Sequence, residues 1–97
     1  MFGIYFLSNI ASENLSLNRY QECISICNRL LSLNTENSYG YFYRGTAYLN
    51  LGKANEGVVD LQKSVTLKED FPNAWFNLSI ALNQLGNYNG ALQAAQK

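Results

Sequence analysis

Similar residues recur 34 positions apart in the middle and in the last third of the chain, and we call this offset the repeat step. Two sets of similar residues are related by it: Tyr41, Ala47, Leu51 and Gly52, then Trp75, Ala81, Leu85 and Gly86. A weaker set stands one repeat step earlier: Leu7, Glu13, Leu17 and Asn18. A fixed period of this size indicates stacked units, because one unit alone cannot bury its own apolar face. The sequence therefore predicts one repeat array over residues 1–97.

Within each unit, apolar residues recur every three or four positions, which is the period of an amphipathic helix. The expected helices span 4–17, 20–33, 38–51, 54–67 and 72–85, and a sixth begins near Tyr88. Ser38 suits a helix start, Gly52 suits a left-handed helix end, and Pro72 suits a first turn. The pattern predicts an all-α fold of paired helices.

Charge is sparse and balanced. Seven basic and seven acidic residues cancel, and the lysines and arginines, Arg44 included, are scattered singly as on a solvated surface. Binding to nucleic acid or to an anionic membrane therefore has no visible electrostatic source. The apolar start, Met1–Leu7, is too short for a signal peptide or a membrane span, so the cytoplasm is the default expectation.

Chemistry-bearing residues are few. The chain has no histidine, and its two cysteines, Cys23 and Cys27, lie four apart on one helix face. A redox pair or metal site is one interpretation, and two small reduced core residues are the favoured one. Glu69 and Asp70 fall in a connector. We therefore expect no catalytic site, no metal and no cofactor.

The residue pattern resembles the tetratricopeptide repeat, a helix–turn–helix unit of about 34 residues. In the middle unit, 38–71, the matching residues are Tyr41, Gly45, Ala47, Tyr48, Gly52, Gly57, Leu61 and Ser64. In the third, 72–97, they are Trp75, Leu78, Ser79, Ala81, Leu82, Gly86, Tyr88, Ala91 and Ala95. In the weaker first unit, 4–37, they are Leu7, Ile10, Ala11, Tyr20, Cys23, Cys27 and Leu30. The resemblance implies a right-handed superhelix, or α-solenoid, of about three units with the last truncated.

The resemblance also implies a function, because the concave side of such arrays holds a partner's extended peptide or helix. It places eleven residues in this groove: Tyr5, Ser8, Ser12, Tyr39, Phe42, Tyr43, Thr46, Asn73, Phe76, Asn77 and Ile80. We expect a non-catalytic interaction scaffold with an uncharged partner segment. Relatives that hold the acidic tail of a chaperone use cations in this groove. No cation stands here, so we expect no binding of such a tail.

Two alternatives stay open. Some groove aromatics could merely cover neighbouring helices, while Trp75, Tyr41, Tyr48 and Tyr88 are expected to pack in the core. Alternatively, the function is self-assembly: an outward-facing final helix, with Ala91, Leu92 and Ala95, would pair between copies. A fragment of a longer array would leave the same end uncovered.

Overall fold

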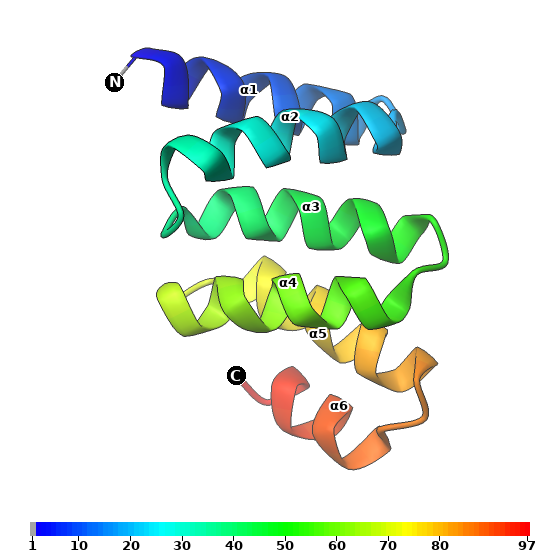
Figure 1. Ribbon diagram of the computed structural model, residues 1–97. Coiled ribbons are helices and arrows are strands. Elements are labelled where there is room, and N and C mark those ends of the chain that lie inside the picture. The colour runs from blue at the N-terminus through cyan, green and yellow to red at the C-terminus, as the bar shows by residue number, and fades with distance from the viewer. Residues whose placement is uncertain (1) are drawn as a thin grey trace.

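The structure is a computed structural model and describes residues 2–97. Its six helices are α1 (Phe2–Ser16), α2 (Tyr20–Leu33), α3 (Ser38–Asn50), α4 (Ala54–Leu67), α5 (Pro72–Gln84) and α6 (Tyr88–Ala95). They form three antiparallel helix–turn–helix pairs (Figure 1). The all-α prediction is confirmed, and every predicted boundary of the first five helices lies within two residues of the observed one.

The turn inside each pair repeats with the period of the sequence. Asn18, Gly52 and Gly86 have φ angles of 62°, 79° and 81°, and each stands one repeat step from the next. Glycine adopts this left-handed conformation without a steric penalty, and asparagine tolerates it better than most residues. The same backbone reversal therefore closes each helix pair, as predicted at Gly52.

Side chains fix several helix starts. The side-chain oxygens of Asn37 and Asn87 accept hydrogen bonds from the backbone N–H groups of Gly40 and Gly90, at 3.0 and 2.9 Å. These bonds satisfy donors that the first turn of a helix leaves free. Pro72 occupies the first turn of α5, where its missing N–H costs nothing.

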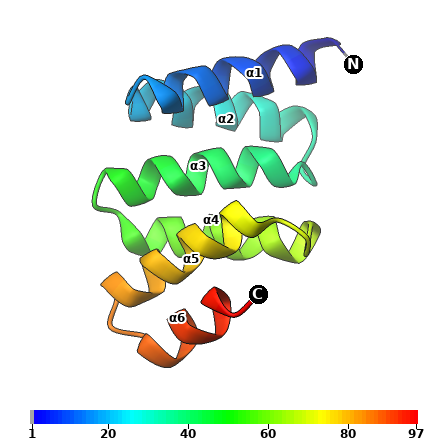
Figure 2. The ribbon, with the colours of Figure 1, turned by 180° about the vertical axis from the view of Figure 1, so that it is seen from behind.

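The packing order gives the array its curvature. Each helix packs on the next, and in addition α1 contacts α3 and α3 contacts α5. Among residues 2–97, no such contact joins α2 to α4 or α4 to α6. The first helices of the pairs therefore lie on the inner, concave side, and Figure 2 looks onto α1 and α5 with α2 and α4 behind them. The molecule measures 40 × 24 × 18 Å.

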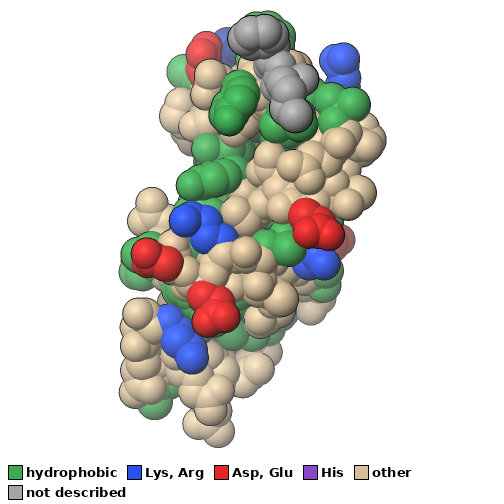
Figure 3. All heavy atoms as spheres, turned by 90° about the vertical axis from the view of Figure 1, so that its left-hand side faces the viewer, with side chains coloured by type: hydrophobic (Ala, Val, Ile, Leu, Met, Phe, Trp, Pro, Cys, Tyr) green, Lys and Arg blue, Asp and Glu red, His purple; other side chains and the backbone are tan. Residues whose placement is uncertain are grey.

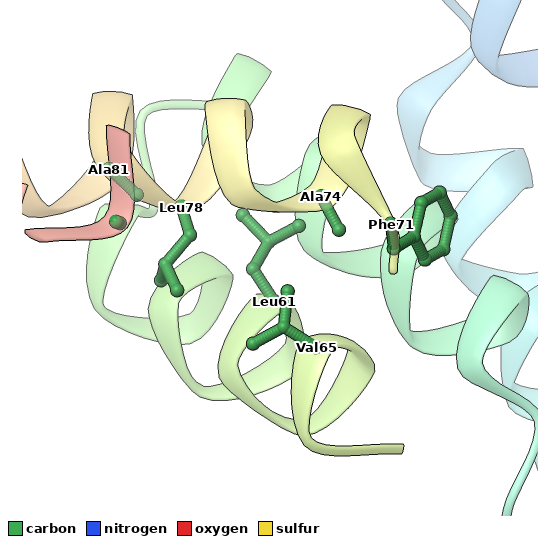
Figure 4. Close-up of a cluster of buried hydrophobic side chains, with 7 residues drawn as sticks. Leu61, Val65, Phe71, Ala74, Leu78 and Ala81 are labelled. Carbon is green, nitrogen blue, oxygen red and sulfur yellow. The ribbon is translucent and has the colours of Figure 1, made fainter. Parts of the chain in front are cut away.

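Two apolar clusters hold the pairs together. One joins Leu61 and Val65 of α4 to Ala74, Leu78 and Ala81 of α5, with Phe71 at one end (Figure 4). The other joins five buried residues of α1, α2 and α3: Ala11, Cys23, Ile24, Cys27 and Ala47. The apolar faces are thus buried between neighbouring helices, as a stacked array requires.

Within residues 2–97, no helix combines the length and the apolar character needed to cross a membrane.

Candidate functional site

The eleven predicted groove residues come from four recurring positions on the first helices of the pairs. The repeat step relates Tyr5, Tyr39 and Asn73, as it relates Ser8, Phe42 and Phe76. Tyr43 and Asn77 form a third row, and Ser12, Thr46 and Ile80 form a fourth. Within each helix these positions follow the spacing i, i+3, i+4 and i+7, which lies along one helix face. We call the surface made by α1, α3 and α5 at these positions the groove face.

None of the eleven side chains is buried, so every one is accessible to a ligand. Among the aromatic side chains the most exposed are Tyr5 and Phe76, with 73% and 64% of their surface accessible, while Tyr39 retains 44%. The others are partly buried, except for Asn73, which is also exposed. Accessible aromatic rings on adjacent helices are the kind of surface that anchors a peptide side chain.

Part of the aromatic surface also has a packing role. The Phe42 ring lies 4.8 Å from that of buried Phe71, and the Tyr39 ring lies 5.2 Å from it. Tyr43 joins this cluster through contacts at 5.5 and 6.4 Å. The covering role left open by the sequence therefore applies to Phe42 in particular, which packs against the α4–α5 core. Phe76 and Tyr5 are the rings left most accessible on the groove face.

The groove face also contains amides, one of which already has a partner. The Asn77 side-chain N–H donates to the Thr46 hydroxyl at 3.0 Å, which joins α5 to α3. Its carbonyl oxygen remains available as an acceptor. Asn9, which is exposed, occupies the α1 position equivalent to Tyr43 and Asn77, and the prediction missed it. Applying the repeat step to Tyr43 would have found it.

All twelve of these residues are uncharged. Acidic and basic side chains lie elsewhere, and Figure 3 shows both signs interspersed among uncharged atoms on one face. The groove face therefore offers apolar contact and neutral hydrogen bonds, and supplies no charged side chain for a carboxylate or an ammonium group.

The sequence model of the tetratricopeptide repeat matches residues 39–71, which contain most of α3 and all of α4. The helix pairs on either side repeat this arrangement. The chain belongs to the tetratricopeptide repeat family. Among curated relatives, it is 32% identical over 85 residues to Protein FlbA of Caulobacter vibrioides, covering 88% of this chain and 14% of FlbA. The chain thus spans about one-seventh of that relative.

Solved tetratricopeptide structures share the fold. The second such domain of Spaghetti (RPAP3), bound to the HSP90 peptide SRMEEVD, superposes with a TM-score of 0.90 at 20% identity, covering 96% of this chain and 86% of that one. The Yersinia enterocolitica secretion chaperone SycD, in complex with a YopD peptide, gives a TM-score of 0.88 at 15% identity and coverages of 97% and 72%. At these identities the likeness establishes the fold of the array.

The tetratricopeptide array contains an ion pair between α3 and α4 that was not predicted from the sequence. Arg44 of α3 donates two hydrogen bonds of 2.8 Å to the carboxylate of Asp60 on α4, and a third of 2.9 Å to the side chain of Asn28 on α2. The hydrogen bonds to Asp60 raise the pKa of Arg44 further above its usual range. Arg44 is thus half-buried and paired, which corrects its assignment to the solvated surface. The side chain of Asp60 is 5% exposed.

The two cysteines are core residues, which is the interpretation that the sequence favoured. Cys23 and Cys27 are buried and free, with their sulfur atoms 4.0 Å apart. The hydrogen bond with Cys23, and burial, raise the pKa of the Cys27 thiol above its usual range. The same hydrogen bond lowers the pKa of the Cys23 thiol. Among the described residues, no group of three metal-ligating side chains comes together.

The exposed end of the array differs from the prediction at two residues. Ala91, expected to face outward, is buried on α6, because the side of α6 that carries Ala91 and Ala94 packs toward the array. Leu92 and Ala95 are exposed, as expected.

Tyr88, expected in the core, is 68% exposed. Trp75, Tyr41 and Tyr48 are partly buried.

Proposed function

We propose that this chain is a non-catalytic protein-interaction scaffold whose groove face binds an uncharged peptide or helix of a partner. The observation that carries the proposal is the accessible, uncharged row of aromatic and amide side chains on α1, α3 and α5. Asn73, Asn77 and Asn9 supply hydrogen bonds for a peptide backbone, and Tyr5 and Phe76 supply apolar contact. Two arrays of the same fold are bound to peptides, the HSP90 segment on Spaghetti (RPAP3) and the YopD segment on SycD.

Phe76 is the side chain on which peptide binding should depend most. We expect peptides selected from a random displayed library to be rich in neutral, apolar residues. Phe76→Ala should weaken the best of them at least tenfold, because an aromatic anchor contributes about 2 kcal/mol or more at a hot spot. Calorimetry with the synthetic peptide measures the change.

Tyr88→Ala is the matched control, because Tyr88 is similarly exposed but lies outside the groove face on α6. It should leave the affinity unchanged. Equal losses from both variants would contradict a groove-face site, and so would a Phe76→Ala variant with full affinity. Phe42 is unsuitable as a probe, because its ring packs against the core.

The acidic tail of a chaperone should not bind, although the related array of Spaghetti (RPAP3) holds the HSP90 peptide SRMEEVD. The groove positions that supply cations in tail-binding relatives hold Ser8, Ser12, Tyr43, Asn73 and Asn77 here. We expect no measurable heat when this peptide is titrated into the chain. The triple variant Ser8→Lys, Asn73→Lys and Asn77→Arg should create binding, since charge-assisted hydrogen bonds become available. Micromolar binding to the unmodified chain would refute the exclusion.

A second candidate function is self-assembly through α6, favoured by the exposure of Leu92 and Ala95. Their equivalents one repeat step earlier are Val58, partly buried, and Leu61, fully buried against α5. In the array, this face of α4 is covered by the next helix pair. A second copy that packs its own first helix on α6 would cover the same face in a head-to-tail contact.

Light scattering over a range of concentrations tests this second candidate. If copies pair through α6, the mass rises with concentration, and Leu92→Asp restores the monomer because a charge in the contact is costly. Gln93→Asp, a neighbouring exposed position outside this apolar face, should leave the association intact. A constant monomer mass would remove self-assembly as a function.

A further inference from the structure

The gaps between the second helices of the pairs are filled differently along the array. Between α2 and α4, Arg44 spans the gap and bonds to Asn28 on one side and Asp60 on the other. Between α4 and α6, the residues one repeat step later are Gln62, Leu78 and Ala94. Leucine and alanine are too short and too apolar to form this bridge. The second gap therefore has no charged bridge, although a cavity of about 380 Å³ also lies beside Arg44 and Asp60 in the middle unit.

Two adjoining cavities of about 330 and 270 Å³ lie in this gap and share Gln62, Trp75 and Lys97 in their walls. We call them together the α4–α6 hollow. Leu78, Leu82 and Ala94 line the larger cavity from α5 and α6, with Trp75 beside them. Their combined size falls within the range of pockets that hold small organic molecules.

The two cavities of the hollow differ in the charged residues that line them. The larger cavity is lined by the side-chain amides of Gln62, Asn87 and Gln93, and by one charged residue, Lys97. The Asn87 oxygen is already bonded to the backbone N–H of Gly90, so its NH₂ group is the part left to bind a ligand. The smaller cavity contains Glu69 as well as Lys97. A negative group is therefore favoured in the larger cavity and disfavoured in the smaller one.

Trp75 and Lys97 give the hollow an aromatic and cationic centre. The Lys97 ammonium lies 5.5 Å from the centre of the Trp75 ring, a cation–π distance. The Trp75 N–H donates to the backbone oxygen of Glu69 at 2.7 Å, which holds the ring in place. An anionic ligand would give the Lys97 ammonium group a partner of full opposite charge, and the apolar part of the same ligand would contact the Trp75 ring.

The hollow is separate from the groove face. Its α5 residues are Trp75, Leu78 and Leu82, whereas the groove face uses Asn73, Phe76, Asn77 and Ile80. With 3.6 residues per turn, these two sets point about 180° apart around α5. A ligand in the hollow would therefore leave the groove face free for a peptide.

We propose that the α4–α6 hollow is a binding site for a small aromatic carboxylate. The ring contacts Trp75 and the apolar wall formed by Leu78, Leu82 and Ala94. The carboxylate accepts hydrogen bonds from Lys97 and from the neighbouring amide groups in the larger cavity, away from Glu69. This site goes beyond peptide binding and does not depend on it.

Trp75 is the single tryptophan of the chain, so its indole N–H resonance reports on the hollow directly. We would titrate the whole chain with β-naphthoate, and separately with β-naphthamide, which has nearly the same shape but no charge. The naphthoate should produce a saturable shift of this resonance. The amide should bind at least about tenfold more weakly, since a hydrogen bond to a charged group contributes more than a neutral one.

Three variants test whether naphthoate binds in the α4–α6 hollow. Lys97→Met should weaken naphthoate at least about tenfold while leaving the amide unchanged, whereas Lys53→Met, at an exposed lysine before α4, should change neither. Leu78→Arg with Ala94→Asp would copy the Arg44–Asp60 pair into the third unit, and should weaken binding of both ligands because two residues of the apolar wall become charged. Circular dichroism checks that this variant folds; if it does not, the lysine variants still decide the proposal. Equal affinities for acid and amide, or no saturable shift, would overturn it.

Discussion

Asp60→Ala is expected to lower the free energy of unfolding by about 3 kcal/mol, because the substitution leaves the half-buried Arg44 guanidinium without its counter-charge. For a domain of this size the total stability is about 5–15 kcal/mol, so this one change removes a large fraction of it. Urea unfolding followed by circular dichroism measures the loss.

The third unit suggests a second substitution that should restore the stability lost in Asp60→Ala. Where the middle unit has Arg44 and Asp60, the third has Leu78 and Ala94. The double variant Arg44→Leu with Asp60→Ala copies that apolar pair, and should return to within about 1 kcal/mol of the parent, since replacing both members of a buried ion pair is often neutral. A double variant as unstable as Asp60→Ala alone would contradict this account, as would an Asp60→Ala variant of full stability.

Gly45→Ala is expected to destabilise the chain by about 2 kcal/mol, even though alanine favours a helix by up to about 1 kcal/mol over glycine. A Cβ atom at position 45 would lie 2.9 Å from Leu61 Cγ, 3.0 Å from Asp60 Cβ and 3.1 Å from the backbone oxygen of Gly57. The backbone oxygen cannot move aside without shifting α4. The two helices approach so closely here because both lack a side chain at the contact.

Gly3→Ala is the matched control, because a Cβ atom there meets nothing within 4 Å in α1. It should leave stability unchanged or raise it slightly. Thermal unfolding of the two variants side by side tests the sign. Two losses of equal size would mean that the α3–α4 contact is not the cause.

The helices were predictable because their signals are local. Asn18, Gly52 and Gly86 mark the turns, Pro72 marks a helix start, and the apolar spacing inside each unit has the helical period. The repeat step then places equivalent positions on the same side of the array, which is why all eleven predicted groove residues are accessible.

The pairing of individual side chains was not predictable in the same way. Phe42 packs on Phe71, and Arg44 binds Asp60, through contacts that depend on how two helices meet. Comparing units would have revealed the Arg44–Asp60 pair, since these two residues of opposite charge stand in the middle unit where the third unit has Leu78 and Ala94. The burial of Ala91 could also have been found by comparing units, since its equivalent one repeat step earlier is Gly57, which is buried on α4.

The most direct test of the proposed function is to map the backbone resonances of the labelled chain as a selected neutral peptide is added. The proposal predicts shifts concentrated on α1, α3 and α5, around Tyr39, Asn73 and Phe76, with Leu92 and Trp75 unaffected. Shifts confined to α6, or to the α4–α6 hollow, would contradict the groove face as the peptide site.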